Sequence, residues 1–339
     1  MKQLFADHLR RYGPEATVRC SSLAAARAYC RQLARTHYEN FLVGSIFLPR
    51  RLIHHFHALY AWCRWADDLG DEVAEPQRAL ELLSWWRNEL LLLYAGQTRH
   101  PVLVALAETV AAFAIPPQPF LDLLSAFEQD QRVRRYETFA ELLDYCRRSA
   151  NPVGRMVLHL FRCCSPDRVA YSDAICTGLQ LANFWQDVAR DWERGRVYLP
   201  QEDRERFGYS DADLSARRCT PAFVRLMEFQ VSRARGFLLA GAPLVDLVPE
   251  EFQPEVRLFL AGGCAVLDAI QRQGGDVWQR RPVVSPWTQA RLVLGCLLRR
   301  YLGPTPSPPR MPRAAASPPN AAAVSIALSG CCPTPTGRP

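Results

Sequence analysis

The stretch from residue 51 to residue 71 reads RLIHHFHALYAWCRWADDLGD, and it decides the fold of this 339-residue chain. Its apolar side chains recur every three or four residues, a spacing typical of an α-helix with one apolar face: Leu52, Phe56, Leu59, Tyr60 and Cys63. Asp67 continues the stripe through Phe56 and Tyr60, and Asp71 lies one turn further on. The helix therefore places carboxylates where the pattern calls for leucine, on a face that we expect to point into the core.

The same helical period runs through most of the chain. Further helices are predicted over residues 76–94, 101–114, 138–148, 153–163, 167–192, 221–239, 254–271 and 286–301. No segment alternates with the two-residue period of a strand, and no Asn-Gly hairpin signal is present. About ten helices joined by short connections predict one all-α domain.

A second acidic segment, NFWQDVARD at residues 183–191, repeats the four-residue spacing. Asn183, Asp187 and Asp191 form a row over two turns, with about 6 Å of axial rise between neighbours. This row also extends an apolar stripe, through Cys176 and Leu179. Carboxylates that converge inside a bundle lose hydration and repel one another, so they require cations for neutralisation.

Carboxylate and amide oxygens at this density suit a hard cation such as Mg²⁺, which completes its shell with water and substrate phosphate. We therefore predict that Asp67, Asp68, Asp71, Asn183, Asp187 and Asp191 hold metal ions that clamp a diphosphate. The alternative is that they are ordinary solvated acids at helix ends. A di-iron bundle is excluded, because no glutamate has a histidine three residues later. Nucleophile-elbow and P-loop motifs are absent from the sequence.

Loss of diphosphate would leave a carbocation, which needs an apolar, aromatic site. Of the aromatic residues near the two acidic segments, we favour Phe41 and Tyr60 for this role. Arg64, one turn before Asp67, is a candidate diphosphate ligand, and Arg196 is a weaker one. A surface salt bridge is the alternative for Arg64.

Composition excludes several classes of protein. The chain is 49% hydrophobic, 22% charged and carries a net charge of +7, which is too mild for a nucleic-acid binder. Its twelve cysteines form no C-x-x-C pair, and neither a signal peptide nor a run of 18 apolar residues is present. We expect a cytoplasmic protein, with peripheral contact to the inner face of the membrane as an option. The last 37 residues contain ten prolines, which predicts a disordered and dispensable tail over residues 303–339.

With these motifs, the chain resembles the squalene/phytoene synthase family of all-α isoprenoid synthases. The resemblance covers about residues 20–302, and residues 1–19 form an N-terminal extension. DDLGD at 67–71, with Tyr60 and Arg64 before it, is similar to the family's first aspartate motif. NFWQDVARD is similar to its second, and GRVYLP at 195–200 to the tail of that motif. Tyr145 followed by NPVG at 151–154 is similar to a further family segment. The resemblance implies a single helical bundle around a central apolar cavity.

One departure points to a branch of the family. Condensing members carry a serine-rich segment before the first motif, whereas this chain has HYENFLVGSIFLP at 37–49. That form resembles the hydroxysqualene synthase (HpnC-type) branch of hopanoid biosynthesis. The branch implies a Mg²⁺-dependent lyase, without NADPH, that turns presqualene diphosphate into hydroxysqualene. It also implies two functional partners, a presqualene diphosphate synthase and a flavin-dependent reductase that forms squalene.

Within this resemblance, the expected catalytic residues are Asp67, Asp71, Asp187, Asp191, Tyr60 and Asn40. The expected substrate-binding residues are Phe41, Arg64, Tyr145, Asn183 and Arg196. We hypothesise that Asn40, together with Glu39, positions the capturing water, and a backbone-capping role for Asn40 is equally open. Two other functions stay open: head-to-head condensation of two prenyl diphosphates, and a non-catalytic helical assembly subunit.

Overall fold

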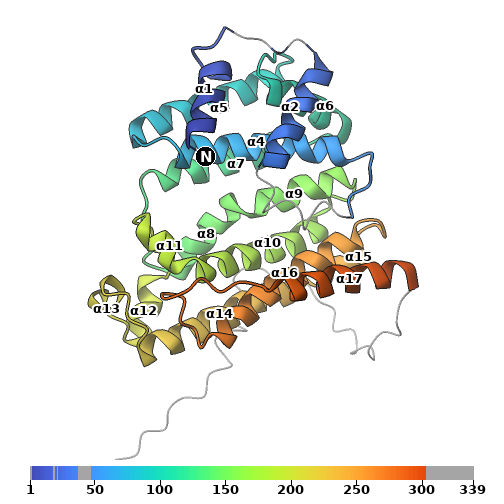
Figure 1. Ribbon diagram of the computed structural model, residues 1–339. Coiled ribbons are helices and arrows are strands. Elements are labelled where there is room, and N and C mark those ends of the chain that lie inside the picture. Colours follow the sequence, from blue (N-terminus) through green and yellow to red (C-terminus); the bar gives the residue numbers. More distant parts are fainter. Residues whose placement is uncertain (1, 18–19, 21, 37–46, 303–339) are drawn as a thin grey trace, which may run out of the picture.

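The computed structural model describes residues 2–17, 20, 22–36 and 47–302, and within these ranges it contains sixteen helices and no strand (Figure 1). The all-α prediction is confirmed. The helices of the N-terminal half are α1 (Lys2–Tyr12), α2 (Leu23–Thr36), α4 (Ile53–Asp71), α5 (Pro76–Tyr94), α6 (Pro101–Phe113), α7 (Gln118–Asp130), α8 (Phe139–Ser149) and α9 (Asn151–Leu160). Those of the C-terminal half are α10 (Pro166–Gln186), α11 (Val188–Glu193), α12 (Gln201–Phe207), α13 (Asp211–Ser215), α14 (Pro221–Gly241), α15 (Leu244–Leu247), α16 (Gln253–Arg272) and α17 (Pro286–Leu302).

Local sequence explains where several of these helices begin. Proline occupies the first turn of α5, α6, α10 and α14, where its missing N–H costs no hydrogen bond. Helix α8 begins with a capping box, in which the Thr138 side chain accepts from the Glu141 backbone and the Glu141 side chain accepts from the Thr138 backbone. The helix predicted over residues 167–192 is wrong in one respect, because it breaks at Asp187 into α10 and α11.

The helices enclose two hydrophobic cores. The N-terminal core lies among α1, α2 and α4–α7 and contains the fully buried Trp62, Trp65 and Trp86. The C-terminal core lies mainly among α8, α10, α14 and α16, and α9 contributes to both. In Figure 1 the two sets of helices form the upper and lower parts of the molecule. Phe56 of α4 packs against both cores, so the face that carries it lies at their junction.

The acid-bearing stripe of α4 lies between the two cores and not inside either one. The helix buries Trp62, Trp65 and Leu69 against the N-terminal helices, whereas Phe56, Tyr60, Cys63 and Asp67 are only half-buried. The tryptophans fill the N-terminal core because their side chains bury more apolar area than the smaller residues of the stripe. The acidic stripe is therefore left at the junction of the two cores, where carboxylates keep contact with solvent.

Helix α10 packs closely against its neighbours α9 and α14. Gly154 of α9 makes the first approach possible, because a Cβ there would lie 2.4 Å from Ser172 Oγ and 2.6 Å from Cys176 Sγ. Before α9 the chain bends at Ala150, and the buried Asn151 side chain accepts a 3.0 Å hydrogen bond from Thr177 Oγ1 of α10. The NPVG segment thus fixes α9 against the helix that carries the second acidic row.

Two further properties concern the chain as a whole. The ten cysteines of the described ranges are all free thiols. Among the helices that the structure describes, none combines the length and hydrophobicity that a membrane span requires.

Phe5 of α1 is buried and lies 5.4 Å, ring to ring, from Trp65, so α1 packs on the N-terminal core.

Candidate functional site

The first acidic row lies at the C-terminal end of α4. Arg64 pairs with two acids of its own helix, Asp68 at four residues' distance and Asp67 at 3.3 Å. Asp68 is buried, whereas Asp67 is half-buried and Asp71 is exposed. Arg64 is largely buried as well, so these contacts are more than the exposed surface salt bridge considered from the sequence.

Asp67 holds a proton more readily than an ordinary aspartate. Burial among the surrounding helices raises its pKa to about 7, and the Asp71 carboxylate adds to the rise, while Arg64 opposes it. The side chain nevertheless keeps 41% of its surface accessible. A carboxylate that is crowded by a second carboxylate yet reachable from solvent is suited to receive a cation.

The second acidic row spans the break between α10 and α11. Asp187 closes α10, and its backbone departs from helical geometry at φ −106° and ψ 15°. The hydrogen bonds from Asp187 N to Asn183 O and from Asp191 N to Asp187 O are both 2.9 Å, so the four-residue row survives the break. Asn183 is exposed and the two aspartates are half-buried, which places the row on an open face rather than in the core.

Arg281, 94 residues further along the chain, holds Asp187 at the break. Its Nε donates to Asp187 Oδ1 at 2.6 Å and its Nη2 to Asp187 Oδ2 at 2.9 Å. The same Nη2 also donates to Gln186 Oε1, and the Gln186 amide donates to the carbonyl of Pro282. Sequence reasoning missed Arg281, because no local spacing relates it to the acidic segment.

Arg196 joins the two acidic rows. Its Nη2 donates to Asp71 Oδ1 at 2.7 Å, and its positive charge also lowers the pKa of Asp191. Gly195, at φ +73°, adopts the left-handed conformation that ends α11 and turns the chain back toward Asp71. The 131–138 connection braces this turn, since Val197 N donates to Arg134 O at 2.8 Å. Arg194 reaches the same aspartate from a more exposed position, at 3.5 Å.

Asp191 resembles Asp67 in its electrostatics. Burial raises its pKa to about 7, the neighbouring Asp187 adds to the rise, and Asp71 of the other row contributes as well. The effect of the Asp71 charge on Asp191 indicates that the two rows lie near each other. Each row therefore contributes one carboxylate with a strongly raised pKa.

A buried aspartate that sequence reasoning missed lies beside Arg196. Asp130, the last residue of α7, is 7% exposed and accepts a 2.8 Å hydrogen bond from Tyr145 Oη. Burial raises its pKa to about 6, although Arg196 and the Tyr145 hydrogen bond both lower it. The one sequence signal was an acid at the end of an apolar helix, directly before the arginine-rich stretch at 132–135.

Aromatic rings pack around this third acid. Phe184 and Tyr198 stack at 3.9 Å, and Tyr136 and Tyr145 lie 5.6–5.9 Å from Tyr198 and from each other. Tyr145, predicted to bind substrate, is buried in this cluster and acts directly on Asp130. Tyr60 is half-buried on α4, and burial raises the pKa of its hydroxyl. Trp65, which is also close to the first acidic segment in sequence, is buried in the N-terminal core.

Several sequence predictions fall outside the described residues. Glu39, Asn40 and Phe41 lie in the segment 37–46, and the predicted tail at 303–339 also lies outside. The roles given to these residues stay predictions.

The acidic rows fit a divalent cation by their chemistry, since they offer oxygen donors alone. Asp71 and Asp187 already pair with arginines, so a cation bound there would share these two carboxylates with the arginines. In the described part of the chain, one group of three possible ligands does lie within 4.8 Å, namely His54, His55 and Glu108. Arg27 donates to both oxygens of Glu108, so that group is an ion-paired packing contact between α2, α4 and α6.

Comparison with known proteins identifies the family of the chain. The sequence profile of the squalene/phytoene synthase family matches residues 34–288. A phytoene synthase of Arthrospira platensis is 35% identical over 272 residues, which are 76% of this chain and 88% of that protein. The crystal structure of squalene synthase HpnC from Alicyclobacillus acidocaldarius is 44% identical, with a TM-score of 0.72 over 74% of this chain and 95% of that one. A dehydrosqualene synthase structure is 26% identical, with a TM-score of 0.74 over 82% and 98%.

Proposed function

Because the chain belongs to the squalene/phytoene synthase family, whose members act on prenyl diphosphates, we propose that it converts presqualene diphosphate into hydroxysqualene. The observation that carries the proposal is the joining of two acidic rows through Arg196, with one strongly raised carboxylate pKa in each row. Such an arrangement suits a ligand that brings both negative charge and divalent cations.

The residues divide into two groups in this proposal. Asp67, Asp71, Asn183, Asp187 and Asp191 would hold Mg²⁺, which neutralises the diphosphate and makes it a good leaving group when bound. Arg64, Arg196 and Arg281 fix the orientation of these carboxylates before substrate enters. Asp68 is less suited as a ligand, because it is buried against Arg64. The functional domain in this proposal comprises residues 20–302.

The chemistry requires no redox cofactor. The carbon–oxygen bond to diphosphate breaks with its electron pair, the cyclopropylcarbinyl skeleton rearranges, and a water oxygen forms the new carbon–oxygen bond while releasing one proton. The closed aromatic packing of Phe184 and Tyr198 keeps bulk water away from one side of the acids. The product would be used by a separate reductase, and the substrate supplied by a separate synthase.

Hydroxysqualene formation is preferred over head-to-head condensation because of the sequence identity to the relatives. The HpnC squalene synthase structure is 44% identical, against 26% for the dehydrosqualene synthase structure and 35% for the Arthrospira phytoene synthase. Head-to-head condensation of two prenyl diphosphates is the second candidate, and it is favoured by the several phytoene synthases among the relatives, at 30–35% identity.

Product analysis separates the two functions. The purified chain is incubated with Mg²⁺ and without NADPH, in one reaction with presqualene diphosphate and in another with farnesyl or geranylgeranyl diphosphate. The proposal expects hydroxysqualene from the first reaction and no C30 or C40 product from the second. Presqualene diphosphate or phytoene formed from the second substrate, with presqualene diphosphate left unconsumed in the first, would establish condensation instead.

A further inference from the structure

Helix α17 exposes an apolar face. Trp287 is 87% exposed, Leu294 55% and Leu298 48%, and their spacing of seven and four residues places them on one side of the helix. The opposite side is anchored, because Cys296 is buried against Phe47 and Leu258. The exposed face is therefore held in place by packing on its other side, and it is not a frayed end.

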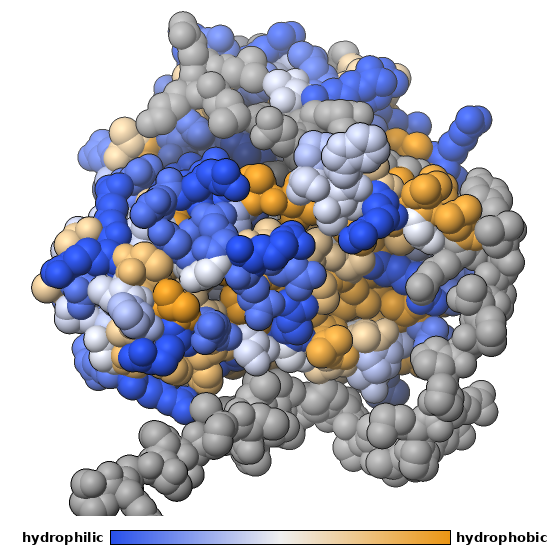
Figure 2. Space-filling model, turned by 60° about the horizontal axis from the view of Figure 1, so that its bottom comes forward, coloured by the Kyte–Doolittle hydropathy of each residue, from blue (hydrophilic) through white to orange (hydrophobic). Residues whose placement is uncertain are grey.

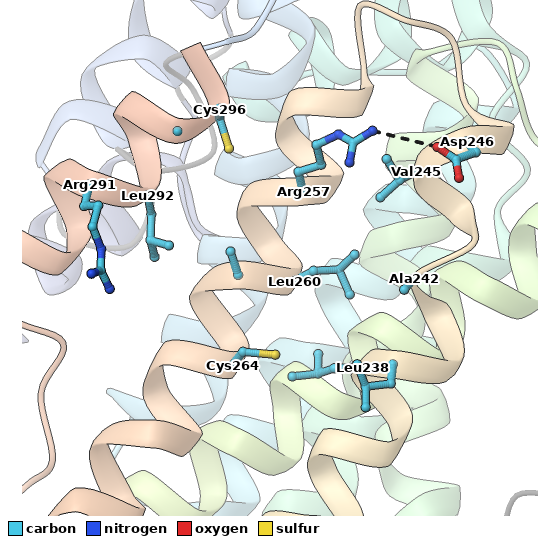
Figure 3. A pocket seen from close by; sticks show the side chains of 13 residues that line it. Leu238, Ala242, Val245, Asp246, Arg257, Leu260, Cys264, Arg291, Leu292 and Cys296 are labelled. Atoms are coloured by element: carbon cyan, nitrogen blue, oxygen red, sulfur yellow. Dashed lines mark ion pairs between the residues drawn. The ribbon is translucent and has the colours of Figure 1, made fainter. Parts of the chain in front are cut away.

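The apolar surface extends across a groove to the neighbouring helices. A cavity of about 470 Å³ lies between α14, α16 and α17 and is lined mainly by apolar side chains, among them Leu238, Leu260 and Leu292 (Figure 3). Leu239 on the rim of the cavity is 62% exposed. Figure 2 shows hydrophobic residues gathered on the face of the molecule that is turned forward from the bottom of Figure 1. Exposed apolar surface of this kind marks an interaction site.

The net positive charge of the chain lies at the C-terminal end of its sequence, from α17 onward and just before it. No acidic residue follows Asp276, whereas eight arginines do: Arg280, Arg281, Arg291, Arg299, Arg300, Arg310, Arg313 and Arg338. The 41 basic residues less these eight leave 33 in residues 1–276, against 34 acids. The whole net positive charge of the protein therefore lies in its last 63 residues. Arg291, one turn after Trp287, is itself exposed on the apolar side of α17.

We propose that the α17 face, made of Trp287, Arg291, Leu294 and Leu298, docks on the surface of an anionic lipid bilayer. An indole ring prefers the interfacial zone of a membrane, leucines enter the acyl region, and arginines bind anionic headgroups. The exposed Arg291 within the face favours this occupant over a second copy of the chain, because a contact between two such faces would bring like charges together. The family profile ends at residue 288, so most of α17 lies beyond it. The proposal is independent of the reaction catalysed.

Co-sedimentation with vesicles tests this surface. The full chain is mixed with vesicles of phosphatidylcholine alone or with 30% phosphatidylglycerol, and the bound fraction is measured. We expect binding to be about tenfold tighter on the anionic vesicles and to weaken at high salt. Trp287→Ala should lower the affinity for anionic vesicles about tenfold, and Arg291→Gln should lower it severalfold.

Matched controls separate this surface from general hydrophobicity. Leu91→Ala and Leu92→Ala remove apolar surface that is similarly exposed on α5, and they should leave vesicle binding unchanged. Thermal unfolding of each variant checks that the fold is intact. The proposal is overturned if the chain does not bind anionic vesicles, or if Trp287→Ala and Arg291→Gln bind them like the parent. It is also overturned if sedimentation velocity shows that Trp287→Ala converts a dimer into a monomer while vesicle binding persists.

Discussion

The first acidic segment lies at the end of an unbroken helix, whereas the second spans the break between α10 and α11. In the first, Arg64 comes from the same helix and pairs with Asp67 and Asp68, three and four residues away. In the second, Arg281 lies 94 residues away in the sequence and donates hydrogen bonds to both carboxylate oxygens of Asp187. The two rows share a four-residue spacing, but Asp67 and Asp68 pair within their own helix, whereas Asp187 is held mainly by an arginine distant in the sequence.

This difference shows which part of the site depends on the rest of the molecule. Asp67 and Asp68 of the first row need only helix α4, because their partner Arg64 lies on the same helix. The second row needs the connection at 279–284 to hold the helix break, and Arg196 needs the turn at Gly195 to reach Asp71. The two rows therefore act as one site only in the completed fold.

The largest effect is expected from removing one charge in each row. Asp67→Asn and Asp187→Asn should each lower the rate of diphosphate release from presqualene diphosphate by about 10²- to 10³-fold, because each removes charge that would hold cations at the leaving group. Asp268→Asn, which breaks a surface pair with Arg235, is the matched control and should stay within twofold. Full activity in either site variant would remove the metal clamp from the account.

The next effect concerns the link between the rows. Arg196 is 13% exposed and lies 2.7 Å from Asp71, whereas Arg194 is 66% exposed and lies 3.5 Å from it. Arg196→Gln should raise the KM for the diphosphate substrate about 10- to 100-fold, the equivalent of about 1.5–3 kcal/mol for a charged hydrogen bond. Arg194→Gln should change it less than threefold. Equal effects of the two variants would show that net charge, rather than the bridge, is what matters.

A smaller effect on stability distinguishes local from long-range organisation. Arg281→Gln should lower the free energy of unfolding in urea by about 1–3 kcal/mol, because it leaves Asp187 without its two donors. Arg190→Gln removes a more exposed partner of the same aspartate, 3.6 Å away, and should cost at most about 0.5 kcal/mol. If Arg281→Gln were as mild as Arg190→Gln, the helix break would not depend on the 279–284 connection.

A further effect is a dependence of stability on pH. The folded pKa of Asp67, about 7, lies above its unfolded value, so its contribution to stability is complete at low pH and is lost as the pH rises through 7. Without divalent cations, the parent should therefore become less stable relative to Asp67→Asn between pH 5 and pH 8, as measured by urea unfolding. Mg²⁺ with inorganic diphosphate should flatten this trend. A difference that is constant with pH would contradict the raised pKa.

The sequence was sufficient for the fold class and for most helix positions. The helices predicted at 76–94 and 286–301 agree closely with α5 and α17, because periodic apolar residues and a leading proline mark them. The helix at 118–130 was not predicted, and the helix at 167–192 was not seen to break. Arg281 binds Asp187 at the break, and a contact across 94 residues leaves no trace in a local pattern.

The site was predictable where its chemistry is periodic. The four-residue spacing identified both acidic rows, and the structure brings them together through Arg196. The α4 stripe was predicted to point into a single core, and it lies between two cores instead. Periodicity does not say which side of a helix packs most tightly, and here Trp62 and Trp65 fill the N-terminal core. Asp130 was missed for a similar reason, since its importance comes from Tyr145 and Arg196, which reach it from other elements.

If both acidic rows act on the same diphosphate, their contributions to its release are coupled, and a double-mutant cycle measures that coupling. Single-turnover diphosphate release is measured for the parent, Asp67→Asn, Asp187→Asn and the double variant, at saturating Mg²⁺ and presqualene diphosphate. If the rows clamp one ligand, the double variant should be little slower than the slower single variant, since either change already disrupts the shared clamp. Losses that multiply, so that the two rows behave independently, would contradict the account.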